Sequence, residues 1–232
     1  MTTLTPQDLY GGALKAIIPH GWLDASELRQ IPNHQELFLS PTTLSNLIYE
    51  INERVSPETA LSSLHSTPST TREALEILGS NPEPTPETIN KAAVLYHLND
   101  IRDSNDDTLH IVAPPQQVSL QKLSGARAYK GIAQITSPLP AASSGGAPAS
   151  IGGATAGSSA EGALESSVSV HYLLVRLEEQ ETDFLVFFNV PHKEFDERGD
   201  LRGLAAEEEL AAAFVDGLVG GFEIANWGLF GG

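Results

Sequence analysis

The sequence contains no cysteine, and basic residues are scarce in it. Without cysteine there is no disulfide framework, no thiolate nucleophile and no cysteine-ligated zinc site. Thirteen lysine and arginine residues stand against 30 aspartate and glutamate residues, which gives a formal net charge of −17. Nucleic acids and anionic membrane surfaces both require a basic face, so we expect neither as a partner. The excess of carboxylates favours a protein partner that carries a basic patch.

Long apolar runs and targeting signals are also lacking. Apolar stretches such as Tyr172–Leu177 and Phe184–Val190 are far shorter than the ~20 residues of a membrane-spanning helix. The N-terminal stretch Met1–Tyr10 has neither the basic nor the apolar region of a secretory signal, so we expect a soluble, intracellular protein. Its 232 residues, 41% of them hydrophobic, with a mean hydropathy of −0.11, suffice for one compact domain.

Motifs that would indicate a nucleotide, a nucleophile or a metal are missing. The sequence has neither a G-x-x-x-x-G-K-[ST] loop nor a G-x-S-x-G elbow. Its seven histidines show no H-E-x-x-H spacing, so we expect no metal or other cofactor. The run Asp103–Asp107 begins like a calcium loop, but Thr108 and Pro114 replace the required glycine and glutamate. We interpret this run as the loop that follows a helix.

Short strands and two proline-initiated helices are predicted for the first half of the chain. Leu47–Ile51 alternates with the period of a strand, and Glu36–Leu39 predicts a neighbouring strand. Proline at the first helical position marks helix starts at Pro57 and Pro86. The first of these helical stretches extends to Gly79 with an interruption. The other expected elements are a short helix or turn at Leu23–Gln30, strands at Ala13–Ile18, Thr108–Val112, Val118–Leu123, Ala126–Thr136 and Phe222–Phe230, and a helix at Leu204–Val219.

A long antiparallel hairpin is the clearest structural signal. Val168–Glu178 and Thr182–Val190 are rich in strand-forming residues around the acidic turn Glu179–Glu181. Both strands are apolar almost throughout, so helices should cover both faces of the sheet. The predicted fold class is α/β, a largely antiparallel β-sheet flanked by helices on both faces. The Ala-, Gly-, Ser- and Pro-rich segment 138–162 cannot bury a core, and we expect a disordered loop within a single domain, 1–232.

The N-terminal third resembles a known family signature. The stretches L-Y-G-G-A-L from Leu9 and I-P-H-G-W-L-D-A-S-E-L-R-Q-I-P-N-H-Q-E from Ile18 are similar to the signature of the Mog family, the Ran guanine nucleotide release factors. His20 and Trp22 depart from the usual motif without a change of charge. Weaker support comes from Leu47–Glu53, Asn189–Pro191 and Trp227–Phe230.

The resemblance implies a fold, a partner and a location. The fold is an antiparallel sheet between helices, similar to the PsbP type. The activity is binding of the small GTPase Ran and promotion of the release of its guanine nucleotide, in support of nuclear protein import. The resemblance therefore implies a non-enzymatic protein in the nucleus, with a cytoplasmic pool. We expect a monomer, since nothing in the sequence indicates an obligate dimer.

The resemblance also implies where Ran binds. Two acidic positions on the strand after the signature fall here at Glu50 and Glu53. Ideal strand alternation would place these two carboxylates on opposite faces of the sheet. Further residues of the signature segment are expected to shape or contact the Ran-binding surface: Asp24, Glu27, Arg29, Asn33, Gln35 and Glu36.

Two other functions remain open from the sequence. Asp24, Glu27 and Glu36 could serve a hydrolase that uses two carboxylates, which would require a deep pocket and one carboxylate with a raised pKa. Alternatively, a PsbP-like sheet could dock a protein unrelated to Ran, since a fold alone does not determine a function.

Overall fold

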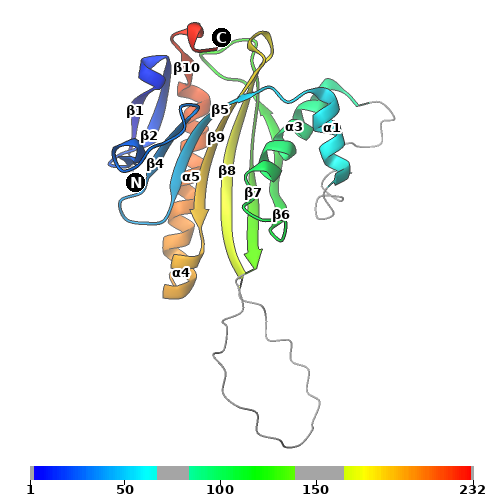
Figure 1. Cartoon of the computed structure of the whole chain (residues 1–232). Coiled ribbons are helices and arrows are strands. Elements are labelled where there is room, and N and C mark those ends of the chain that lie inside the picture. The colour runs from blue at the N-terminus through cyan, green and yellow to red at the C-terminus, as the bar shows by residue number, and fades with distance from the viewer. Residues whose placement is uncertain (1–2, 67–83, 139–164, 231–232) are drawn as a thin grey trace, which may run out of the picture.

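A seven-stranded antiparallel sheet forms the centre of the computed structural model, which describes residues 3–66, 84–138 and 165–230 (Figure 1). Its strand order is β3-β4-β5-β9-β8-β7-β6, and every neighbouring pair is antiparallel. A smaller sheet has the order β1-β2-β10. The strands are β1 Leu4–Leu9, β2 Leu14–Pro19, β3 Leu23–Asp24, β4 Gln35–Leu39, β5 Asn46–Glu53, β6 Thr108–Val118, β7 Arg127–Pro138, β8 Glu165–Leu177, β9 Thr182–Pro191 and β10 Glu223–Ile224.

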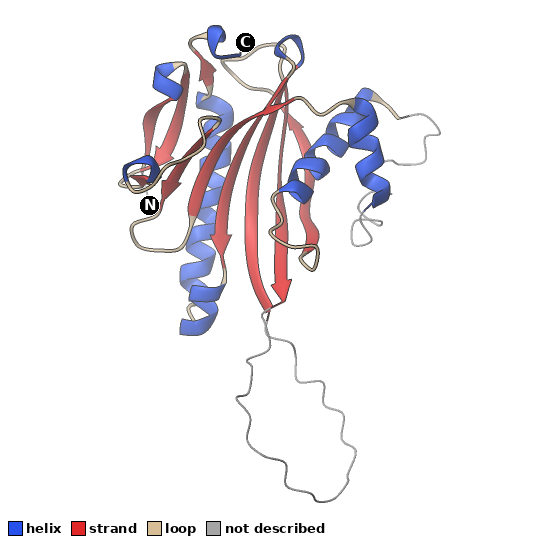
Figure 2. Ribbon diagram, in the orientation of Figure 1, coloured by secondary structure: helices blue, strands red, loops and turns tan. Residues whose placement is uncertain are grey.

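Helices lie on both faces of the large sheet, as the sequence predicts (Figure 2). Helices α1 (Pro57–Ser66) and α3 (Pro86–Asp100) pack together and cover part of one face. Helix α5 (Leu201–Gly221), preceded by α4 (Lys193–Arg198), covers the other face and also contacts β2 of the small sheet. The fold class is therefore confirmed. Within residues 3–66, 84–138 and 165–230, none of the helices has the length and hydropathy of a membrane-spanning segment.

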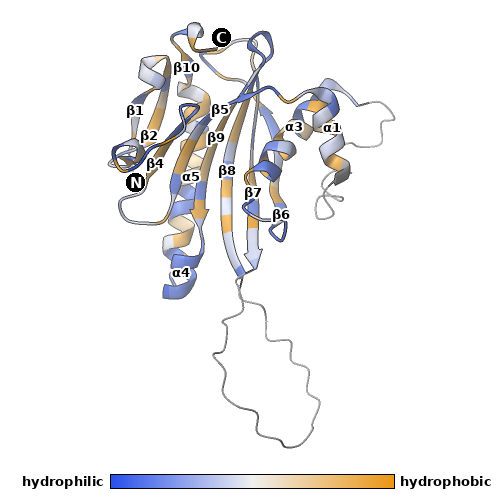
Figure 3. Ribbon diagram, in the orientation of Figure 1, coloured by the Kyte–Doolittle hydropathy of each residue, from blue (hydrophilic) through white to orange (hydrophobic). Residues whose placement is uncertain are grey.

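The large sheet separates two apolar core clusters, and its central strands β8 and β9 carry many of the hydrophobic residues coloured orange in Figure 3. Along β8, Leu173 and Val175 face the cluster under α5, while Tyr172 and Leu174 face the cluster under α3. This alternation explains why the hairpin reads as continuously apolar, since each face of the sheet needs its own apolar set. Each fully buried large side chain contributes about 1.5–3 kcal/mol relative to exposure, so the hairpin anchors both layers.

The predicted strand Val118–Leu123 is wrong. Val118 is the last residue of β6, which is one long strand with two register shifts in its pairing to β7, between Ile111 and Ala113 and between Ala113 and Gln116. The prolines that follow Ala113 cannot donate ladder hydrogen bonds, and irregular pairing is how an edge strand accommodates them. A turn with Gly125 in the left-handed region (φ 96°) then leads into β7.

The ends of two other elements also differ from expectation. Only Glu223–Ile224 of the predicted strand Phe222–Phe230 pairs with β2, and a 3-10 helix follows at Trp227–Phe230. Leu23–Gln30 divides into the short strand β3 and a 3-10 turn, η2, at Ala25–Glu27. Of the segment predicted to be a loop, 138–162, only Pro138 lies within the described residues. The expected helical stretch toward Gly79 is described only as far as α1.

Candidate functional site

The signature segment builds the edge of the large sheet beside the small one. Tyr10 adopts a left-handed conformation (φ 49°), followed by Gly11 and Gly12 at φ 64° and 88°, which makes a tight turn between β1 and β2. The Tyr10 hydroxyl reaches the carbonyls of His34 and Tyr49, at 3.0 and 3.1 Å. Tyr10 therefore connects the turn after β1 both to β5 and to the loop that precedes β4.

Two signature carboxylates accept hydrogen bonds within the chain. The backbone N–H of Tyr10 donates to Glu36, and Oδ1 of Asp24 accepts from the backbone N–H of Ser26 at 2.8 Å, which caps η2. Burial raises the pKa of Glu36, and the nearby charge of Asp24 raises it further, while the Tyr10 N–H acts in the opposite sense. Both side chains thus stabilise the local conformation at this edge of the large sheet. Their contact with Ran stays a prediction.

The other signature candidates lie on the surface. Glu27, Arg29 and Asn33 are exposed on η2 and on the loop before β4. Gln35 is half-buried and lies directly opposite Glu50 in the β4–β5 register. Only Gln35 among these four lines the groove that contains Glu50.

A groove of about 500 Å³ crosses the large sheet beyond the end of α3; we call it the sheet groove. Glu50 lies in it with 15% of its side chain exposed, and His34 Nε2 lies 3.9 Å from its carboxylate. Carboxylates outnumber cations in the lining: four of them, Glu50, Asp100, Asp103 and Asp107, stand against the single guanidinium of Arg102. The apolar lining residues are Ile48, Ile101, Ile135, Val168, Val170, Phe187 and Pro191.

Glu53 borders a second hollow, of about 380 Å³, with Tyr96 and His97 of α3. Strand alternation places Glu50 and Glu53 on opposite faces of β5, because they are three residues apart. Glu53 is, however, the last residue of the strand and pairs with Thr182 at the start of β9. Asp100 lines both hollows, so Glu50 and Glu53 each border a hollow at the C-terminal end of α3.

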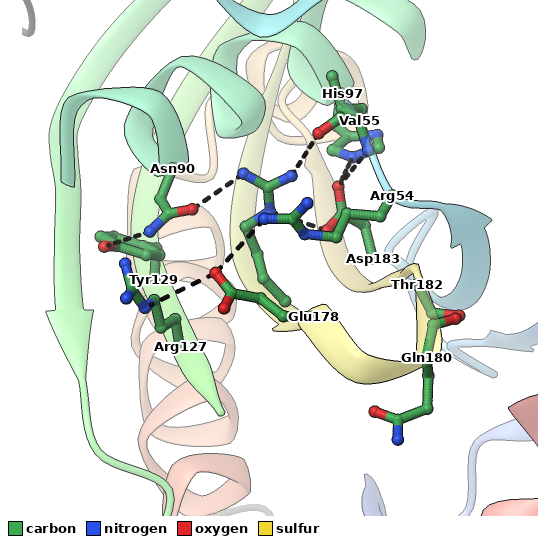
Figure 4. A network of polar contacts seen from close by, with 11 residues as sticks. Arg54, Val55, Asn90, His97, Arg127, Tyr129, Glu178, Gln180, Thr182 and Asp183 are labelled. Atoms are coloured by element: carbon green, nitrogen blue, oxygen red, sulfur yellow. Dashed lines mark hydrogen bonds and ion pairs between the residues drawn. The ribbon is translucent and has the colours of Figure 1, made fainter. Parts of the chain in front are cut away.

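A polar network fixes the elements that carry these carboxylates (Figure 4), and its centre, formed by Arg176 and Asp183, is fully buried. Arg176 donates from Nε to Asp183 at 2.9 Å, from Nη1 to Asn90 at 2.9 Å and from Nη2 to the Val55 carbonyl at 2.5 Å. His97 Nε2 lies 3.0 Å from Oδ2 of Asp183, which also accepts from the Val55 N–H at 3.0 Å. Val55 follows Glu53 by two residues and His97 precedes Asp100 by three. The network therefore positions the backbone that carries both of these carboxylates.

The charge state of this network follows from its geometry. Burial alone would raise the pKa of Asp183, but the hydrogen bond from His97, the charge of Arg176 and the Val55 N–H together lower it. The carboxylate therefore stays ionised beside the guanidinium. Each of the three guanidinium nitrogens of Arg176 donates a hydrogen bond. These bonds offset the desolvation cost of the buried charge, which is several kcal/mol for an unpaired ion.

Two of the three carboxylates considered for a hydrolase, Asp24 and Glu36, accept hydrogen bonds from backbone N–H groups of the described chain. Glu36 has the raised pKa, but its carboxylate is occupied by the Tyr10 N–H rather than directed at a substrate. Ser169, His192 and Glu208 cluster under α5, yet Ser169 and Glu208 both approach Nε2 of His192, at 2.8 and 3.3 Å. In a catalytic triad the acid binds the other ring nitrogen. In the described residues no group of His, Asp and Glu could hold a metal ion.

Sequence reasoning missed the contribution of α3 and its following loop. Arg102 Nη1 donates to the Asp107 carbonyl at 2.9 Å, and the Asp107 carboxylate accepts from the Ser104 N–H at 3.1 Å, which gives the loop its fold. From the sequence alone, the acidic run Asp103–Asp107 indicates only a loop after a helix. Its proximity to Glu50 depends on the packing of α3 across the sheet, for which the sequence has no local signal.

Solved structures define the class of this fold. The Saccharomyces cerevisiae Ran-binding protein Mog1p superposes with a TM-score of 0.55 at 18% sequence identity, over 99% of this chain and 100% of that one. A Mog1 point mutant has a TM-score of 0.57 at 17% identity, over 98% and 99% of the two chains. At these identities the likeness shows the fold, which is the Mog fold.

Sequence comparison then gives the family. Residues 7–191 match the family described as Ran-interacting Mog1 protein, so the chain belongs to that family. The Ran guanine nucleotide release factor of Danio rerio is 27% identical over 191 residues, covering 79% of this chain and 76% of that protein. The Homo sapiens Ran guanine nucleotide release factor is 49% identical over 45 residues, which span 19% of this chain and 24% of that protein.

Proposed function

We propose that this protein binds the small GTPase Ran and promotes the release of its bound guanine nucleotide, in support of nuclear protein import. Family membership over residues 7–191 carries the proposal. Release factors from Danio rerio and Homo sapiens and a nuclear import protein, MOG1, from Saccharomyces cerevisiae are among the similar proteins. The protein acts as a monomer without a cofactor, in the nucleus and in a cytoplasmic pool.

The proposed Ran-binding surface is the end of α3 with the carboxylates on either side of it. Glu50 and Glu53 flank Asp100 there, and a surface with this charge attracts a basic region of a partner. Long-range attraction raises the association rate and weakens as salt screens it. The proposed surface also includes the exposed residues Glu27, Arg29 and Asn33 of the signature segment, while Asp24, Gln35 and Glu36 support its shape.

The mechanism requires no bond-breaking group in this chain. A protein that binds nucleotide-free Ran more tightly than nucleotide-bound Ran lowers the affinity of Ran for its nucleotide. The factor of this decrease equals the ratio of the two affinities. The free energy comes from the difference between the two affinities, so a tight complex with equal affinities would release nothing. The protein is therefore a binding factor rather than an enzyme in the bond-making sense.

Release of a fluorescent GTP analogue from purified Ran tests the proposal. We expect the release rate to rise with the concentration of this protein, to saturate as a complex forms, and to rise less at high salt. Unchanged release with no detectable complex would contradict the proposal. A protein other than Ran recovered as the main partner from a nuclear lysate, together with that result, would support the docking-module alternative instead.

A further inference from the structure

The floor of the sheet groove is apolar, and its attraction for a partner is therefore not electrostatic. Phe187 and Val170 form its buried base, and the half-buried Ile48 and Val168 lie beside them on β5 and β8. Helices α1 and α3 cover the neighbouring part of this face but leave this end of the sheet as a hollow of about 500 Å³. A hollow of this size can hold one or two side chains of a partner.

The rim of the groove differs chemically from its floor. Glu50 stands on β5, and Asp100 and Asp103 stand at the end of α3 and on the loop after it. The one cation of the lining, Arg102, donates to the carbonyls of Asn99 and Asp107 at 3.3 and 2.9 Å. Its guanidinium is thus held by the loop, and the rim presents a negative surface around an apolar floor.

We propose that the sheet groove receives a segment of Ran in which an apolar side chain is flanked by lysine or arginine. The apolar side chain packs on the floor, and the flanking cations pair with the carboxylates of the rim. This inference rests on the proposed function, because it names the part of the partner that the same surface recognises. It adds that an apolar anchor, and not charge alone, provides the affinity.

The floor is preorganised for such an anchor. It consists of residues from four adjacent strands, β5, β9, β8 and β7, whose pairing is continuous across the groove. Two of its polar side chains are joined to each other, since Asn189 Nδ2 donates to Asn46 Oδ1 at 2.8 Å. A floor that is already ordered binds an apolar side chain at a small ordering cost, and buried apolar anchors contribute strongly to interface energies.

Methyl NMR of the wild-type protein tests the inference without a mutation. The isoleucine and valine methyl groups are labelled, Ran is added, and protection from a soluble paramagnetic agent is measured. We expect the methyl signals of Ile48 and Val168 to shift and to gain protection. Ile111 is the internal control, because it is also a half-buried isoleucine packed on the same core cluster but lies outside the groove.

A matched pair of variants gives the second arm. Ile48→Ala should weaken Ran binding about tenfold or more, with the salt dependence of binding unchanged, whereas Ile111→Ala should leave the affinity within about threefold. Urea unfolding reports the stability of both variants, and Ile48→Val serves if Ile48→Ala does not fold. Ran binding that neither shifts the groove methyls nor responds to Ile48 would overturn the apolar anchor and leave the proposed function intact. No Ran binding by the wild type would overturn both.

Discussion

Arg176 on β8 and Asp183 on β9 form an ion pair inside the core, with Nε 2.9 Å from Oδ1 and no exposed side-chain surface on either residue. They lie directly opposite each other in the β8–β9 register. Through the same two side chains the sheet holds His97 of α3 and both backbone polar groups of Val55. The pair therefore fixes α3 and the end of β5 relative to the sheet.

Asp183→Asn should lower the free energy of unfolding by about 3–5 kcal/mol, because it leaves the Arg176 charge buried and uncompensated. Urea unfolding monitored by circular dichroism measures the change. Asp8→Asn is the matched control, since it breaks the surface pair between Lys15 and Asp8 and should cost less than about 1 kcal/mol. Similar losses in the two variants would show that the buried pair does not have the proposed role.

Acid should lower the unfolding free energy of the protein through Glu208, which lies on α5. Burial would raise the pKa of Glu208, but hydrogen bonds from His171 and His192 lower it well below its usual value near 4.5. A carboxyl with a lowered pKa in the folded state contributes stability that is complete above about pH 4.5 and is lost as the pH falls further. The unfolding free energy of the wild type should therefore decline more steeply between about pH 5 and pH 3 than that of Glu208→Gln. Parallel pH profiles would contradict this account.

Glu36 should prove to be a structural residue of the sheet edge. Glu36→Ala removes the acceptor of the Tyr10 N–H and should cost about 1–3 kcal/mol of stability. Glu36→Gln keeps an acceptor oxygen and should cost less, with Ran affinity close to that of the wild type. Thermal unfolding and a Ran-binding titration separate the two effects. A large loss of Ran affinity in a fully stable Glu36→Gln protein would identify Glu36 as a direct contact.

The segment between β7 and β8 should be dispensable. Pro138 and Glu165 face each other as the closing pair of these strands, so an Asn-Gly turn can replace residues 139–164. We expect the shortened protein to unfold at a similar temperature and to bind Ran within about threefold of the wild type, since loop closure changes stability only slowly with length. A loss of Ran affinity above about tenfold would show that the segment takes part in binding.

Local sequence patterns predicted those parts of the fold that depend on local chemistry. The β8–β9 hairpin and the start of α3 at Pro86 follow from alternation and from proline at the first helical turn. The strand predicted at Val118–Leu123 was wrong. Its apolar residues Leu120 and Leu123 lie in a loop, and their side chains are buried in the core. Burial alone does not distinguish these two cases.

The candidate site was predictable only in part. Glu50 and Glu53 were found through resemblance to a family, and the signature carboxylates through their density in a short segment. Asp100 and the apolar floor at Phe187 and Val170 come from elements far apart in the chain, which only the packing of α3 on the sheet brings together. The buried network was not predicted either, because the partners of Arg176 and Asp183 on α3 are 86 residues away in the sequence.

The release of a fluorescent GTP analogue from Ran by charge-reversed variants tests the central claim most directly. Glu50→Lys and Glu53→Lys are compared with Glu209→Lys, which makes the same change of charge on exposed α5 at the other face. The account predicts that each of the first two variants slows release at least about tenfold relative to the wild type, while Glu209→Lys differs by less than about threefold. Equal effects of all three variants would mean that net charge, and not the surface at the end of α3, governs the action on Ran.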